Sequence, residues 1–209
     1  MTAKKAGCQV TVVLSVVLSA MAFVYPKAVG AQEVPPPALL DVPIVTQDTP
    51  AWCWLAASEM VIRHENTGIS LRQCEMLEIG FALPVGECCR DLASCTGFAY
   101  GMEEMQSIIA QFGGVVTTLT PPLPPQVLYG SLLSGHPVIA RIRSGLTASH
   151  AIVIRGMRFR ATEETAPDGT VTTIVEPILF VNDPLSYFPH ELPYERLLPL
   201  WIDSLIVDP

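Results

Sequence analysis

The order of apolar and polar residues predicts helices in the first part of the chain. Residues 53–65, CWLAASEMVIRHE, combine good helix formers with apolar side chains at helical spacing, and Gly68 follows as a stop signal. Two more segments have helical character: 101–114, closed by a pair of glycines, and 124–135, which has proline in its first turn. A short strand is expected between them, at 115–120.

From residue 136 onward the pattern is typical of strands. Segments rich in valine and isoleucine alternate with turn residues, at 136–143, 150–160, 170–176, 177–183 and 201–207. The Pro167-Asp168-Gly169 turn predicts a hairpin between the second and third of these, and YERLLP predicts a helical turn before the last. Helices followed by an antiparallel sheet predict an α+β fold.

The first 31 residues are expected to be a signal peptide rather than part of this fold. Lys4 and Lys5 precede a long apolar run, and small residues end at Ala31, which fits a cleavage site before Gln32. The alternative is an uncleaved membrane anchor, because the run approaches spanning length. We therefore expect an exported, secreted or periplasmic protein with one domain at 32–209, divided into a helical half at about 45–135 and a β half at about 136–209.

Cleavage of this segment changes the charge of the chain. All three lysines leave with it, so 20 acidic residues face nine arginines, a formal charge of −11. Nucleic acids and anionic membranes are bound by basic surfaces. The composition therefore argues against both as partners of the mature chain, which we expect to be a monomer.

The cysteine count singles out one thiol. Cleavage of the signal peptide removes Cys8 and leaves five cysteines. Four of them lie close together in CEMLEIGFALPVGECCRDLASC, residues 74–95, which is expected to be a loop, while Cys53 stands apart at the start of the first helix. Because a bridge between adjacent cysteines is strained, the four are expected to pair as Cys74–Cys88 with Cys89–Cys95, or as Cys74–Cys89 with Cys88–Cys95. A tetrathiolate zinc site is the alternative, but its cysteines are usually spaced pairs. No metal or cofactor is expected.

Cys53 has the surroundings of a nucleophile. A helix N-terminus favours the thiolate, which is the reactive form. Of the four histidines, His64 is about 16 Å along the same helix and too far to pair. His136 is expected at a strand entry and His190 in a surface loop, whereas His150 opens the strongest strand, HAIVIRG.

Two further elements complete a catalytic pattern. FVNDP places Asn182 and Asp183 at the end of another late strand, where either could accept a hydrogen bond from His150 and orient it. Gln47 lies six residues before Cys53, and its side-chain NH2 could stabilise an oxyanion together with the Cys53 backbone N–H.

These residues resemble the papain-like cysteine peptidases. Gln47, five intervening residues and Cys53-Trp54 at a helix start match the family's oxyanion and nucleophile segment. SGHPVIARIRSG, SHAIVIRGM and FVNDPL look still closer to short bacterial members, among them staphopain-like, plant-effector-type and bacteriocin-leader-processing peptidases. In these, a G-x-P-V-I strand precedes the strand opened by the catalytic histidine, and an Asp-Pro carries the third catalytic residue. The resemblance covers about residues 42–185.

The resemblance implies a bacterial thiol peptidase acting on a protein or peptide. Cys53 would be the nucleophile, His150 the base and Gln47 the oxyanion donor. Asp183 would orient the base, with Asn182 as the alternative because papain has asparagine there. The same residues would also serve an acyltransferase or amidase, and the third alternative is a non-catalytic binding module. Papain's small residues before its cysteine are replaced here by 49–52, so we expect Trp52 to narrow the substrate groove.

Overall fold

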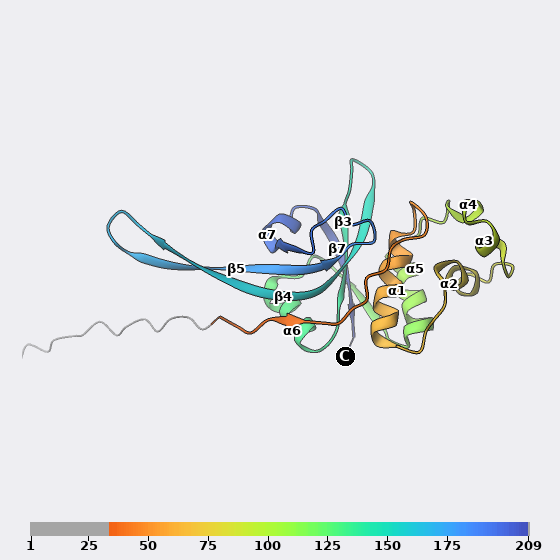
Figure 1. The fold of residues 1–209 in the computed structure, drawn as a ribbon, viewed down its shortest axis with the longest axis horizontal. Helices are drawn as coiled ribbons and strands as arrows, with labels where there is room; N and C mark the ends of the chain where they lie inside the picture. The colour runs from red at the N-terminus through yellow and green to blue at the C-terminus, as the bar shows by residue number, and fades with distance from the viewer. Residues whose placement is uncertain (1–33, 209) are drawn as a thin grey trace, which may run out of the picture. The chain divides into compact units, whose positions relative to one another are not determined.

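The computed structural model describes residues 34–208, which form one unit of helices and antiparallel strands (Figure 1). The expected signal peptide, 1–31, lies outside the described residues. The predicted α+β fold is confirmed, because helices come first and the later strands belong to one antiparallel sheet. None of the helices between residues 34 and 208 combines the length and the apolar character that a bilayer span requires.

The helices follow the predicted pattern with two differences. They are α1 (Cys53–Glu65), α2 (Gln73–Gly80), α3 (Glu87–Arg90), α4 (Leu92–Cys95), α5 (Met102–Ile108), α6 (Pro125–Leu133) and α7 (Tyr194–Leu197). First, the cysteine-rich stretch expected as a loop contains the short helices α2, α3 and α4. Second, the helix expected at 101–114 is α5, which widens at its end into a π-helical turn, Ile109–Gly113.

The strands form one antiparallel sheet in the order β2-β7-β3-β4-β5-β6, with β1 paired to β4. Their bounds are β1 Ala38–Leu39, β2 Thr117–Thr120, β3 Val138–Arg143, β4 Ser149–Thr165, β5 Val171–Asn182, β6 Glu191–Pro193 and β7 Trp201–Val207. The chain crosses over between β2 and β3 through α6, and β7 returns to lie between them. Strands β4 and β5, which follow each other along the chain, lie side by side.

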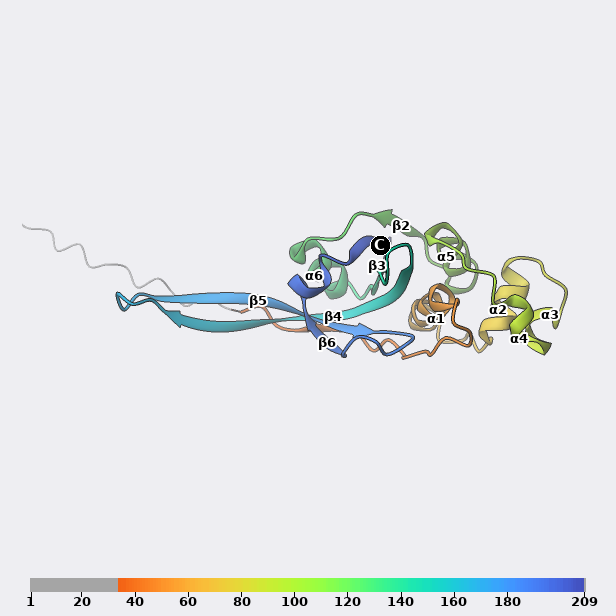
Figure 2. The same cartoon turned by 90° about the horizontal axis from the view of Figure 1, so that it is seen from above.

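The hairpin predicted at residues 167–169 joins β4 and β5, which extend from the sheet as a long two-stranded ribbon (Figures 1 and 2). The sequence predicted a break between strands at 176 and 177, and this is wrong: β5 is continuous. Pro177 pairs with Phe159 of β4, and β6 begins its pairing only at Ile178. At Pro177 the edge of β5 that faces away from β4 is therefore unpaired. A proline, which has no backbone N–H, costs no hydrogen bond between strands at such an edge.

Apolar residues cover both faces of the sheet. On one face α1 packs on β4, and α2 and α5 pack on α1, with Leu55 and Met60 of α1 buried in the same core as Val153 of β4. On the other face α6 contributes Leu128 and Leu132 to a second core. Each fully buried side chain of this kind stabilises the fold by about 1.5–3 kcal/mol. Packing of α1 on β4 brings the N-terminus of α1 close to the first residues of β4.

Candidate active site

Cys53 is the first residue of α1 and the free thiol among the described cysteines. Its side chain is half-buried, in contact with the core below it but open to a cavity above. The first N–H groups of a helix have no partner within the helix, and their partial positive charge favours a thiolate. Cys53 therefore lies at a helix N-terminus, as the sequence predicted.

His150 and Asp183 come together because β4 and β5 are neighbours in the sheet. His150 is the second residue of β4, Asp183 directly follows β5, and both side chains are buried. His150 Nε2 donates to Asp183 Oδ1 at 2.6 Å. The Asp183 carboxylate also accepts backbone N–H groups from the turn that follows it, those of Leu185, Tyr187 and Phe188. A carboxylate held in this way keeps its charge and its orientation.

The three side chains shift one another's ionisation. Burial acts to lower the pKa of His150, but hydrogen bonds to Asp183 and Cys53 outweigh it and raise that pKa to about 9. Burial acts to raise the pKa of Cys53, but hydrogen bonds to His150 and to the backbone N–H groups of Ala151 and Trp54, together with the charge of His150, outweigh it and lower that pKa. Burial likewise raises the pKa of Asp183, and its bonds to His150 and to the following turn lower it overall. These directions favour a thiolate beside an imidazolium at neutral pH.

Asn182, the alternative partner of His150, has a different place. It is fully buried, and its Nδ2 donates to the Val42 carbonyl at 3.0 Å. Its Oδ1 accepts from Arg155 Nε at 3.0 Å. Asn182 therefore ties the segment before α1 to the sheet, whereas Asp183, the next residue, is hydrogen-bonded to His150.

Gln47 lies on the loop that leads into α1, and its side chain is buried. Its Nε2 donates to the Thr49 carbonyl at 2.6 Å, and Gln47 does not line the cavity at Cys53. Gln73 of α2 holds this loop from both sides: its Nε2 donates to Thr46 O at 2.8 Å, and its Oε1 accepts from Asp48 N at 3.0 Å. The role assigned to Gln47 stays a prediction. Gln73 was missed because only the fold brings α2 to this loop.

Trp52 does not narrow the groove, so that prediction is wrong. Its side chain is fully buried, and its indole N–H donates to the carbonyl of Cys95 at 3.2 Å. The indole of Trp54 similarly donates to Phe98 O at 3.1 Å. An indole is large and apolar with one donor, so it is favourably buried where that donor meets a carbonyl. Both tryptophans therefore anchor the start of α1 to the cysteine-rich segment.

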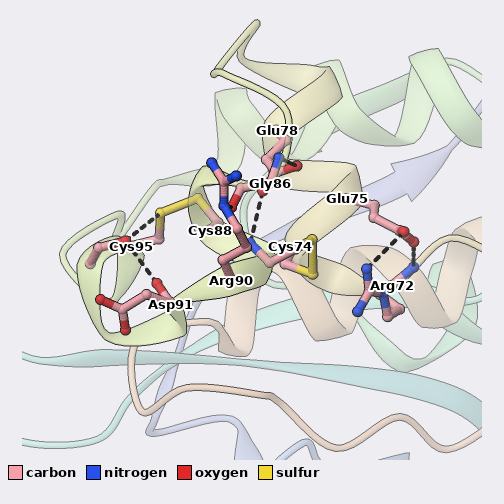
Figure 3. The surroundings of a disulfide bond; sticks show 11 residues. Arg72, Cys74, Glu75, Glu78, Gly86, Cys88, Arg90, Asp91 and Cys95 are labelled. Atoms are coloured by element: carbon pink, nitrogen blue, oxygen red, sulfur yellow. Dashed lines mark hydrogen bonds and ion pairs between the residues drawn. A yellow bond between two sulfur atoms is a disulfide. The ribbon is translucent and has the colours of Figure 1, made fainter.

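Two disulfides hold that segment together (Figure 3). They pair Cys74 with Cys89 and Cys88 with Cys95, which is one of the two patterns expected from the sequence. The Glu78 carboxylate of α2 accepts from Gly86 N at 2.7 Å and Cys89 N at 2.8 Å. The Cys88–Cys95 disulfide thus constrains the residue whose carbonyl accepts from the indole of Trp52, which directly precedes Cys53.

A cavity of about 300 Å³ opens at Cys53 and His150. The start of α5 forms one wall with Tyr100, Met102 and Met105, and β3 contributes Arg141, which is ion-paired with Asp203. The other histidines lie elsewhere, as expected: His64 bonds the Gly135 carbonyl at 2.9 Å. Within residues 34–208 no cluster of three or more His, Cys, Asp or Glu side chains suits a metal ion.

The chain was compared with proteins of known family and structure. No curated protein matches it. Among solved structures, one described as a C39-like peptidase from Bacillus anthracis is similar at 11% identity with a TM-score of 0.48, covering 84% of this chain and 98% of that chain. The profile of the family described as papain-like cysteine protease AvrRpt2 matches residues 37–187. The chain therefore belongs to this family of papain-like cysteine proteases and is a cysteine-type peptidase.

Proposed function

We propose that the chain hydrolyses peptide bonds of a protein or peptide substrate through Cys53, His150 and Asp183. The observation that carries this proposal is the 2.6 Å hydrogen bond from His150 Nε2 to Asp183 Oδ1, next to a free thiol at a helix N-terminus. A buried histidine with this partner is oriented and charged, as activation of a thiol requires. Site geometry and family thus support the same chemistry.

The chemistry proceeds in two halves. The Cys53 thiolate attacks the scissile carbonyl carbon, and the oxyanion that forms is stabilised by the Cys53 backbone N–H and the side-chain NH2 of Gln47. The imidazolium of His150 gives its proton to the leaving amine, which departs and leaves a thioester. His150 then takes a proton from water as the water attacks the thioester, and the acid product leaves. Asp183 keeps the imidazole in one orientation throughout.

We also propose that the protein acts outside the cytoplasm. The basic and apolar N-terminal segment supports export, and two disulfides in one small domain are typical of oxidising compartments. The disulfide partners are all distinct from Cys53. The nucleophile can therefore remain reduced while the four other cysteines stay paired.

Product analysis tests the proposed reaction. Peptides from a random library are incubated with the protein in water enriched in ¹⁸O, with and without an added amine, and the products are identified by mass spectrometry. We expect new C-termini carrying ¹⁸O in both samples. If the main products are amides of the added amine, the site serves acyl transfer. If no bond is broken, the chain is a binding module.

A Gln47→Ala variant tests the oxyanion donor. Loss of one such donor is expected to lower kcat by about 10²–10³-fold with little change in KM, because the donor acts on charge that develops in the transition state. Steady-state kinetics on one cleaved peptide measure this. Gln73→Leu is the matched variant, because Gln73 holds the loop that carries Gln47 but is not itself the proposed donor. It should lower kcat by a smaller factor. Equal kcat in wild type and Gln47→Ala would rule out the role.

A further inference from the structure

A second hollow adjoins His150, and Cys53 is not part of its lining. Its volume is about 490 Å³, and its lining includes Arg143, Ser144, His150, Tyr187, Phe188 and Leu200. The cavity at the nucleophile has a different lining and shares His150 with this one. His150 therefore borders two spaces, and Cys53 borders only the first of them.

The proposed mechanism indicates which part of the substrate the second hollow would bind. His150 protonates the leaving amine, so the part of the substrate beyond the scissile bond lies on the histidine side of the nucleophile. The acyl part, which becomes the thioester, stays in the cavity that contains Cys53. The second hollow is consequently in the right place for the leaving group, and this assignment rests on the proposed function.

The charge in this hollow comes from Arg143. It is the last residue of β3, its side chain is exposed, and its backbone N–H donates to Leu200 O at 2.7 Å. Arg141, two residues earlier, is neutralised by Asp203, with Nε 2.9 Å from Oδ1. No acidic side chain among residues 34–208 forms an ion pair with Arg143, although acidic residues outnumber basic ones 20 to 12 in the whole chain. Its guanidinium therefore remains available for an anion.

Aromatic side chains form the opposite wall. Tyr187 and Phe188 follow Asp183 in the turn whose N–H groups bind that carboxylate, at 2.8 and 3.0 Å. The Tyr187 ring centre lies 6.0 Å from that of His150. The wall is thus held by the same hydrogen bonds that orient the catalytic pair. Tyr187 itself is largely exposed, so the hollow is open to solvent and an ion pair formed in it is a partly exposed one.

We propose that this hollow binds the leaving side of the substrate and that Arg143 selects a carboxylate there. The carboxylate belongs either to an acidic side chain just beyond the scissile bond or to a free C-terminus. A guanidinium binds both through the same pair of parallel hydrogen bonds. Arg143 is then a specificity residue of the proposed peptidase, in a chain whose other surface charge is mainly negative.

Paired peptides test this proposal. One pair differs only by Glu or Gln at the first position after the cleaved bond, and a second pair ends one residue later as a free acid or as an amide. Wild type should favour one carboxylate member by about three- to fivefold in kcat/KM at low ionic strength, and less at high salt, as for a partly exposed ion pair. The pair that shows the preference identifies the source of the carboxylate.

Variants link the preference to Arg143. Arg143→Gln should bring the ratio within each pair to about one, Arg143→Lys should retain part of it, and Arg143→Glu should reverse it in favour of a lysine peptide. Arg196→Gln removes the same charge from the exposed surface of α7 and should keep the wild-type ratio. Cleavage without preference in wild type, or a preference that survives in Arg143→Gln, overturns this proposal alone. Absence of any cleavage overturns the proposed function, and the proposal with it.

Discussion

Replacement of Cys53 by serine is expected to lower kcat/KM by at least about 10³-fold on every peptide that the parent cleaves. The reason is ionisation: His150 holds the thiol as a thiolate, whereas a serine hydroxyl has a much higher pKa and stays protonated beside the same imidazole. The fold should be preserved, because Cys53 is half-buried and takes part in no disulfide. Steady-state kinetics with matched thermal unfolding curves separate loss of chemistry from loss of structure.

A histidine pair provides the control for this result. His150→Gln should lower kcat/KM to a similar degree, whereas His190→Gln, at an exposed position beyond β5, should retain activity. The combined variant of Cys53 and His150 should be no worse than either alone, because residues that act as a unit are not additive. Full activity of Cys53→Ser would place the chemistry elsewhere in the molecule.

Replacement of Asp183 by alanine is expected to lower kcat by about 10²–10⁴-fold. Without the carboxylate, His150 loses its orienting hydrogen bond, and the pKa of His150 falls from about 9 towards its ordinary value of 6.5. The imidazolium that donates to the leaving amine then disappears at lower pH. The alkaline limb of the rate profile, near pH 9 in wild type, should therefore move to lower pH.

Asn182→Ala is the matched control for Asp183. Asn182 bridges the Val42 carbonyl and Arg155, so its loss should lower the temperature of unfolding and leave the pH profile of activity in place. Asp183→Asn preserves an oxygen that can accept from His150, and it should lose less activity than Asp183→Ala. A shifted pH profile in Asn182→Ala together with an unchanged one in Asp183→Ala would assign the orienting role to Asn182.

The parts of the fold that sequence could predict are those set by local signals. Helix α1 begins at Cys53 and ends at Glu65, as predicted, because helix formers, apolar spacing and small residues all agree there. The β4–β5 hairpin was predicted from Pro167-Asp168-Gly169. Pro177 shows the limit of such rules: a proline is a break in a central strand but is tolerated on an open edge, and the edge is a property of the assembled sheet.

The long-range contacts at the site could not be predicted in the same way. Cys53, His150 and Asp183 were predicted from their order and context and from the resemblance. Which of Asp183 and Asn182 meets His150 depends on the turn after β5, which local sequence does not show. Trp52 was assigned to the substrate groove because it adjoins the nucleophile. Trp52 is instead buried in the core, where its indole N–H donates to the carbonyl of Cys95, a residue of the Cys88–Cys95 disulfide. Spacing alone favoured neither disulfide pattern.

Arg143 illustrates a second kind of information that only the fold supplies. In the sequence it is one of two arginines at the end of a strand. The structure distinguishes them through their partners, because Arg141 meets Asp203 across β3 and β7 while Arg143 lines the hollow beside His150.

The pH dependence of Cys53 alkylation tests the thiolate–imidazolium pair most directly. A neutral reagent such as iodoacetamide is used with the disulfides intact, and modification of Cys53 is followed by mass spectrometry from pH 4 to pH 10. We predict a rate that is already substantial well below the ordinary thiol pKa of about 8.5, with a further change near pH 9 as His150 loses its proton. In His150→Ala the rate should rise only near the ordinary thiol pKa. A single rise near that pKa in both proteins would contradict the account.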